Sequence, residues 1–196
     1  MRILQKWKSP CLHLLGVVFC ALAGPALAQL QDENLLAPMP EGFKSATQQV
    51  QGGVVFQEWI PSGESLANWS EMVTIQILLG KKDIDGGRYL GGIRSEWLKA
   101  CPETRPNAVT AGRTNGYPNW SMDLQCPRLA NTGKPETTLF RSFQGRDSFY
   151  SVQRSARAVP DGAQRAKMAA YIESVTVCDT RSSAHPCPDL KRPGSK

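Results

Sequence analysis

The chain has 196 residues, a formal net charge of +6 and 41% hydrophobic residues, which is typical of one globular domain. No run of Lys and Arg exceeds two residues, so a nucleic-acid partner is not expected, because nucleic-acid binding needs a clustered basic surface. The sequence has no Cys-X-X-Cys motif, and His185 is its one histidine beyond position 28. We therefore expect no metal and no cofactor.

Residues 1–28 have the layout of a secretory signal peptide. Three basic residues precede an apolar stretch at 14–23, and Ala-Leu-Ala at 26–28 supplies a cleavage site after Ala28. The apolar stretch is too short to span a bilayer, which takes about 20 residues, so an uncleaved anchor is the less favoured alternative. We expect a periplasmic or secreted protein with no integral membrane segment after cleavage. The mature chain then carries a formal charge of +3.

Residues 29–40 are polar with two prolines and are predicted to be a loose leader before a single α+β domain at 41–178. Strands are predicted near 42–44 and at 54–60, where β-branched and aromatic residues precede a Pro-Ser-Gly turn. Residues 72–79 alternate, with aliphatic side chains at 73, 75, 77 and 79 on one face. That alternation predicts a half-buried strand.

Over residues 86–101, the apolar residues recur with the period of an α-helix. Leu90, Ile93, Trp97 and Cys101 fall on one side of such a helix, and Pro102 ends it. Glycine pairs at 86–87 and 91–92 weaken the first turns, so the helix is expected to begin near Ile93.

Residues 119–126 alternate again, with Trp120, Met122, Leu124 and Cys126 on one face. An inward-facing Cys126 can meet Cys101 at the end of a helix packed over the sheet. The four cysteines of the mature chain allow three pairings. We favour Cys101–Cys126 and Cys178–Cys187, because each pair is the nearest in sequence.

The last part of the domain is predicted to be a hairpin followed by a helix. Strands at 137–143 and 148–159 are joined by a short loop containing Gly145. Asp161 is a candidate N-cap for the helix that follows. Residues 179–196 are predicted to be a disulfide-pinned turn and a flexible tail. Adjacent strands with two covering helices predict an α+β fold with a single curved antiparallel sheet and helices packed on it.

This order of elements resembles the Mog1/PsbP-like sandwich, in which an antiparallel sheet lies between helices. Three segments, at 69–74, 143–150 and 177–180, also resemble a group of small secreted proteobacterial proteins with no assigned activity. The PsbP-like resemblance implies an accessory or binding protein rather than an enzyme. The resemblance to the secreted proteobacterial proteins covers most of the mature chain and provides no catalytic residues.

The candidate binding residues are Arg141, Arg146, Tyr150 and Arg154, which cluster in sequence within the last hairpin and could hold an anionic group. Any cleft is expected between the glycine-rich loop 83–92 and this hairpin. If Tyr150 and Arg154 form a surface site, replacing them with alanine should weaken binding and leave the melting temperature nearly unchanged.

The favoured function is therefore a periplasmic or secreted, non-catalytic accessory protein that binds an envelope protein or a small ligand. The alternative is a small carboxylate-based hydrolase that acts on cell-wall or polysaccharide substrate. It would use strand carboxylates such as Glu58 and Asp123. Glu71 lies just before the second clear strand, and two of these carboxylates could approach if their strands are neighbours. His185 lies in the short predicted disulfide loop and is expected to be a surface residue rather than part of a triad.

Overall fold

A computed structural model describes residues 31–188 of the chain. The predicted signal peptide with its cleavage site at Ala28, and the tail from 189 onward, lie outside the described residues. The strands are β1 (Glu33–Leu36), β2 (Phe43–Gln51), β3 (Val54–Pro61), β4 (Glu71–Leu79), β5 (Arg105–Pro106), β6 (Thr110–Thr114), β7 (Tyr117–Cys126), β8 (Glu136–Gln144), β9 (Ser148–Ala156) and β10 (Thr176–Asp179). The helices are α1 (Gly86–Ala100) and α2 (Gly162–Ser174).

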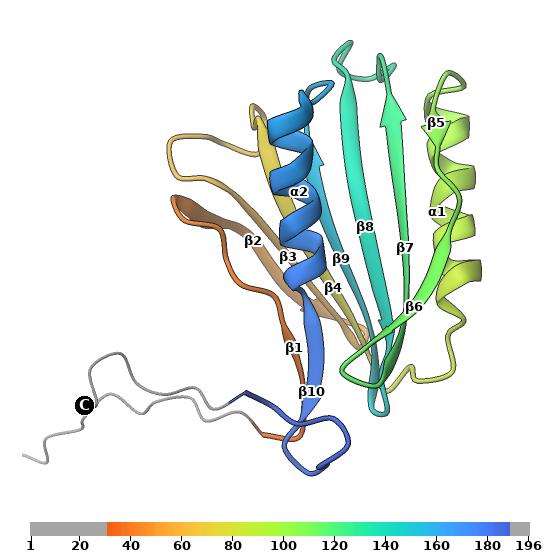
Figure 1. Ribbon diagram of the computed structural model, residues 1–196. Coiled ribbons are helices and arrows are strands. Elements are labelled where there is room, and N and C mark those ends of the chain that lie inside the picture. The colour runs from red at the N-terminus through yellow and green to blue at the C-terminus, as the bar shows by residue number, and fades with distance from the viewer. Residues whose placement is uncertain (1–30, 189–196) are drawn as a thin grey trace, which may run out of the picture.

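Eight strands form one large antiparallel sheet, which confirms the predicted fold class. Their order is β2-β3-β4-β9-β8-β7-β5, and β6 also pairs with β7. Every pairing is antiparallel. The helices lie on opposite faces of this sheet, with α1 beyond β7 and α2 across β8 and β9 in Figure 1. The sheet is therefore the middle layer of a sandwich.

The α1 side holds one apolar cluster. Leu90 of α1 packs with Met122, Leu124 and Phe140 from β7 and β8. Trp97 also packs against this cluster, so the predicted apolar stripe of the helix faces the sheet. A satellite cluster of Ile60, Trp69 and Met72 lies further along the sheet.

The α2 side holds the larger core. Met168 and Ile172 of α2 meet inward-facing residues of β4, β8 and β9, among them Val73 and Val152. Met72 and Thr74 of β4 are buried as well as Val73 and Ile75, and Met72 packs with Ile60 and Trp69 on the face opposite α2. The alternation predicts a strand with one solvent-exposed face, whereas the central part of β4 is buried on both faces.

Helix α1 begins at Gly86, seven residues before the predicted start. The Asp85 side chain caps it by accepting a hydrogen bond from the Arg88 backbone N–H at 2.7 Å. A Cβ atom at Gly86 would overlap the Trp120 ring. Glycine at this position therefore reflects the close approach of the helix to β7, which outweighs its weak helix propensity.

Both predicted disulfides are present in the structure. Cys101, the C-cap of α1, is bonded to Cys126 at the end of β7, and Cys178 of β10 is bonded to Cys187. The first bond ties the end of the helix to the sheet, as expected from an inward-facing Cys126.

The predicted leader contributes a strand to the folded domain. β1, within the segment 29–40, pairs with β10 over four residues, from Glu33–Asp179 to Leu36–Thr176. Leu35 and Ala37 pack against the core under α2. The folded domain therefore begins before the expected boundary at residue 41, because apolar residues inside this polar segment are partly buried against the core. The small β1–β10 sheet is also an addition to the predicted single sheet.

Within residues 31–188, no helix has the length and apolarity that crossing a membrane requires.

Candidate functional site

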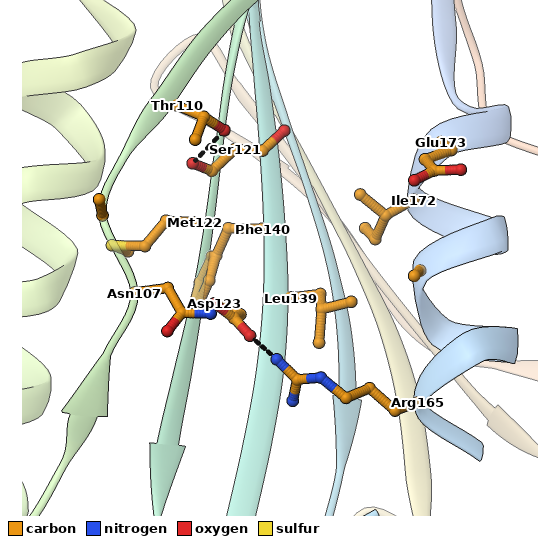
Figure 2. Close-up of a pocket in the computed structure, with 12 residues that line it drawn as sticks. Asn107, Thr110, Ser121, Met122, Asp123, Leu139, Phe140, Arg165, Ile172 and Glu173 are labelled. Carbon is orange, nitrogen blue, oxygen red and sulfur yellow. Dashed lines mark hydrogen bonds and ion pairs between the residues drawn. The ribbon is translucent and has the colours of Figure 1, made fainter. Parts of the chain in front are cut away.

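A groove of about 330 Å³ runs between α2 and the β6–β7 edge of the sheet. Figure 2 shows side chains of β7, β8 and α2 facing one another across it. Its volume is at the lower end of the range for small-molecule sites. The connection between β5 and β6 forms the outer wall, where the Asn107 backbone N–H donates to the Asp123 carbonyl at 3.0 Å.

An ion pair bounds the groove toward the N-terminal half of α2. Arg165 of α2 donates to the Asp123 carboxylate of β7. Asp123 is mostly buried, with 16% of its side chain exposed, whereas 42% of the Arg165 side chain is exposed. The Arg165 side chain therefore remains accessible beside the groove, while the charge of the Asp123 carboxylate is compensated by the ion pair.

The rest of the lining combines an apolar floor with polar walls. Leu139, Ala169 and Ile172 provide aliphatic surface. Thr110 and Ser121 bring hydroxyls, and the Thr110 hydroxyl donates to the Ser121 carbonyl at 3.4 Å. Such a lining suits an occupant with an apolar body and a few hydrogen-bonding groups.

The carboxylates of the alternative hydrolase are not brought together. The row Trp59–Val73–Arg154–Leu139–Asp123 runs across the sheet on the α2 side. Glu58 precedes Trp59 and therefore lies on the opposite face, where Thr47 donates to its carboxylate at 2.9 Å. Four strand spacings, about 19 Å, separate β3 from β7, whereas paired glycosidase carboxylates lie about 5–9.5 Å apart.

Arg141, the first candidate binding residue, bonds to the C-terminal end of α2. Its Nη1 donates to the carbonyls of Ile172, Glu173 and Val175 at 2.9, 3.0 and 3.3 Å, and Nη2 donates to the Thr114 hydroxyl. Burial lowers the pKa of the Arg141 guanidinium from its ordinary value. A cation here complements the negative end of the helix, so the side chain ties α2 to β6 and β8.

Arg154 lies beneath α2 at the other side of the core. It forms an ion pair with Glu71, and its guanidinium carbon lies 4.7 Å from the centre of the Phe43 ring and 5.6 Å from that of Tyr171. Only 9% of its side chain is exposed. Burial lowers the pKa of Arg154, and the Glu71 carboxylate opposes that shift. Burial also raises the pKa of Tyr171 to about 12.

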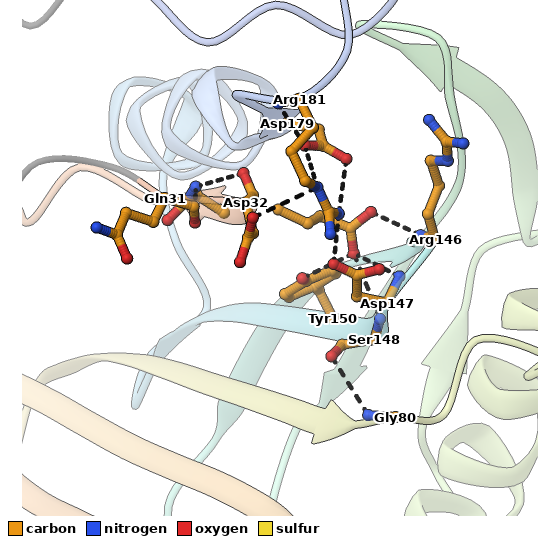
Figure 3. Close-up of polar contacts among 11 residues, drawn as sticks. Gln31, Asp32, Gly80, Arg146, Asp147, Ser148, Tyr150, Asp179 and Arg181 are labelled. Atoms are coloured by element: carbon orange, nitrogen blue, oxygen red, sulfur yellow. Dashed lines mark hydrogen bonds and ion pairs between the residues drawn. The ribbon is translucent and has the colours of Figure 1, made fainter.

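Arg146 and Tyr150 meet at the turn between β8 and β9 (Figure 3). The Arg146 backbone N–H donates to the Glu33 carboxylate at 2.6 Å, and the Tyr150 hydroxyl donates to it at 2.9 Å. The Arg146 side chain is exposed and points away from this contact. Nearby, Arg181 bridges Asp179 and Asp147 at 2.8 and 2.5 Å.

The four candidate residues thus occupy three separate places. Arg146 and Tyr150 share one carboxylate, whereas Arg141 and Arg154 bond to different parts of the α2 side. Where a cleft was expected between loop 83–92 and the hairpin, the Tyr89 and Phe149 rings pack together with centres 4.9 Å apart. Gln144 also donates to the Lys82 carbonyl at 2.9 Å.

His185 packs on the domain rather than facing a carboxylate. Its ring centre lies 4.5 Å from that of Tyr117, and its Nδ1 is 2.8 Å from the Asn115 carbonyl. Among residues 31–188, no three His, Cys, Asp or Glu side chains are grouped so as to hold a metal ion.

Sequence reasoning missed Glu33 and the groove. Leu35 and Leu36, an apolar pair within the polar leader, are a signal that this segment packs on the domain, where both are partly buried. Asp123 was singled out only as an acid–base candidate. Arg165, its partner, is separated from it by 42 residues, and no local pattern joins the two.

The fold is similar to that of several solved structures. Cyanobacterial PsbP (CyanoP) from Synechocystis sp. PCC 6803 matches 80% of this chain and 98% of its own, with a TM-score of 0.52 and 11% identity. The match with LpqN, involved in cell envelope biogenesis of Mycobacterium tuberculosis, covers 76% of this chain and 86% of LpqN, with a TM-score of 0.46 and 15% identity. The match with the Saccharomyces cerevisiae Ran-binding protein Mog1p covers 72% of this chain and 84% of Mog1p, with a TM-score of 0.41 and 10% identity.

The likeness to PsbP shows a common α+β fold, as the sequence resemblance implied. No protein-family model matches the sequence, and no curated protein matches it. At these identities the comparison extends to the fold and not to a ligand or an activity.

Proposed function

We propose that this chain is a periplasmic or secreted accessory protein that binds a partner without transforming it, and that the groove beside α2 is its binding site. The location is supported by the predicted signal peptide and by two disulfides, which persist in oxidising compartments.

The observation that carries the proposal is the chemistry of the groove. It combines aliphatic side chains with hydroxyls and the Asn107 amide, which suits recognition of shape and polar groups. Its carboxylate Asp123 is paired with Arg165, and a carboxylate neutralised in this way is a poor general base. The second lining carboxylate, Glu173, is exposed at the rim.

The test uses two neighbouring alanines of α2. Ala169 lines the groove, whereas Ala170 is exposed and does not line it. Ala169→Arg fills the groove with a long side chain, and Ala170→Arg adds the same charge to the outer side of the helix. The tagged mature protein and each variant are exported and crosslinked in the intact envelope, and captured proteins are quantified by mass spectrometry.

We expect the unmodified chain and Ala170→Arg to capture one stoichiometric partner. Ala169→Arg should bind this partner at least roughly tenfold more weakly, a loss of about 1.4 kcal/mol of binding free energy. Equal capture by both variants would refute the groove as the site. Turnover of envelope polysaccharide with a carboxylate-dependent pH profile would instead support the hydrolase.

A further inference from the structure

The turn between β8 and β9 presents a set of donors to one carboxylate. The backbone N–H groups of Arg146, Asp147 and Ser148 donate to Glu33 at 2.6, 3.1 and 3.3 Å. The Tyr150 hydroxyl adds a fourth donor at 2.9 Å. Successive backbone N–H groups that converge in this way form an anion-binding nest.

Gly145 leaves the space that this carboxylate fills. A Cβ atom at residue 145 would overlap a Glu33 carboxylate oxygen and the Tyr150 ring. The Gly145 backbone N–H donates to the Ser148 carbonyl at 2.9 Å and closes the turn. The glycine therefore shapes the turn around the carboxylate, and any larger residue would push the carboxylate out.

The nest holds its anion through hydrogen-bond donors rather than through net charge, because three nearby acidic residues share the one guanidinium of Arg181. Asp147, the acidic residue of the turn, is paired with Arg181 at 2.5 Å, which offsets its repulsion of a second carboxylate. Burial and the Glu33 charge both raise the pKa of Tyr150 above its ordinary value, so the phenol stays protonated and donates at neutral pH.

The residue that fills the nest is held by a short strand. β1 pairs with β10 over four residues only, and a stretch with two prolines at 38 and 40 separates it from β2. Signal-peptide cleavage after Ala28 would make Glu33 the fifth residue of the mature chain. Four ladder pairs and the partly buried Leu35 hold this strand, and a segment held by so few contacts opens locally at a lower free-energy cost than global unfolding.

We infer that the β8–β9 turn is a carboxylate-binding site, which Glu33 fills in the free chain and which an acidic residue of a partner protein fills when β1 is displaced. The site is separate from the groove beside α2, and the inference holds whether or not the groove binds a partner.

In the first experiment, Glu33→Ala removes the carboxylate from the nest in the mature chain, and acetate is added as a free carboxylate. Sodium chloride at equal ionic strength is the control salt. We expect acetate, and not chloride, to raise the melting temperature of Glu33→Ala and to shift the amide resonances of Arg146–Ser148. The unmodified chain should respond equally to both salts, because Glu33 already occupies the site.

Adding Tyr150→Phe to Glu33→Ala removes one donor with little change in shape and should weaken the acetate response. If Glu33→Ala does not fold in chloride, the refolding yield in acetate against chloride reports the same binding. Equal effects of acetate and chloride on Glu33→Ala would overturn the carboxylate site.

The second experiment tests occupancy by a separate molecule. The probe is a peptide with the sequence of residues 29–37, QLQDENLLA, and the matched control has Gln in place of its one Glu. The glutamate peptide should bind Glu33→Ala roughly tenfold more tightly than the unmodified chain, in which the tethered Glu33 competes at high effective concentration. The glutamine peptide should show no such gain. Equal affinity of the two peptides for Glu33→Ala, or binding by neither, would overturn exchange with a partner.

Discussion

Arg154 and Glu71 form an ion pair beneath the N-terminal half of α2, and the helix contacts the same carboxylate. Gln164 donates to the second Glu71 oxygen at 2.9 Å. On the β7 side, Arg165 pairs with Asp123. Two consecutive helix residues thus bond to carboxylates on strands at opposite sides of the core, which fixes α2 across β9 and β8 and sets the width of the groove.

Arg154→Ala should lower the free energy of unfolding by about 3 kcal/mol. The side chain is 91% buried, and removing one member of such a pair leaves Glu71 without its counter-ion. This differs from the sequence-based expectation of an unchanged melting temperature, which assumed an exposed arginine. Urea denaturation of Arg154→Ala and of the double variant Arg154→Met/Glu71→Gln provides the check. The double variant should recover most of the loss, because it removes both charges.

Replacing two glycines of α1 with alanine should change the free energy of unfolding in opposite directions. Gly86→Ala places a methyl group in the Trp120 ring and should cost about 1–3 kcal/mol through overpacking. Gly92 lies on an exposed part of the same helix with open space around it, so Gly92→Ala should add about 0.5–1 kcal/mol. Thermal and urea denaturation of both variants measure this. A loss of stability in Gly92→Ala would contradict the assigned helix.

Acid should weaken the contact between Asp179 and Arg181. Asp179 accepts from the Arg181 backbone and from its guanidinium at 2.8–2.9 Å, and hydrogen bonds from Arg181 hold the pKa of Asp179 at about 2. Because the folded pKa lies below the unfolded value of about 3.9, the stabilisation is complete above about pH 5 and declines as the pH falls toward 2.

The comparison variant for this pH dependence is Asp179→Asn. Its free energy of unfolding should be lower than that of the unmodified chain at pH 6, and the difference should shrink between about pH 5 and pH 2. Urea denaturation at several pH values measures the two curves. A difference that is constant with pH would mean that the Asp179 charge does not provide the stabilisation.

The elements that the sequence predicted correctly share a strong local period. The stripe from Leu90 to Trp97 and the alternation around Met122 each mark one face, and together they place Cys101 opposite Cys126. The start of α1 was misplaced because local propensity penalises Gly86, whereas the tertiary contact with Trp120 requires it. β6 was missed because Thr110–Thr114 is exposed and has no large apolar side chain.

The two candidate binding places depend on contacts that no local pattern encodes. Glu33 and the turn that binds it are more than 110 residues apart in sequence, and a glutamate in a polar leader carries no sign of its partner. The hairpin arginines were interpreted as a surface cluster because alternation alone does not show that α2 covers that face. Because α2 covers that face, Arg141 and Arg154 bond to groups within the domain.

Arg141→Ala should destabilise the end of α2 by about 2 kcal/mol, because three carbonyls lose a charged donor. Hydrogen exchange should show faster opening at the end of α2 and in β10, which follows it directly. Arg141→Lys keeps the charge but lacks a planar fork that reaches both the carbonyls and Thr114, so it should recover only part of the loss. The control is Arg94→Ala on the exposed side of α1, which should change stability by less than about 0.5 kcal/mol. If Arg141→Ala behaves like Arg94→Ala, the arginine is free to contact a ligand, as first expected from the sequence.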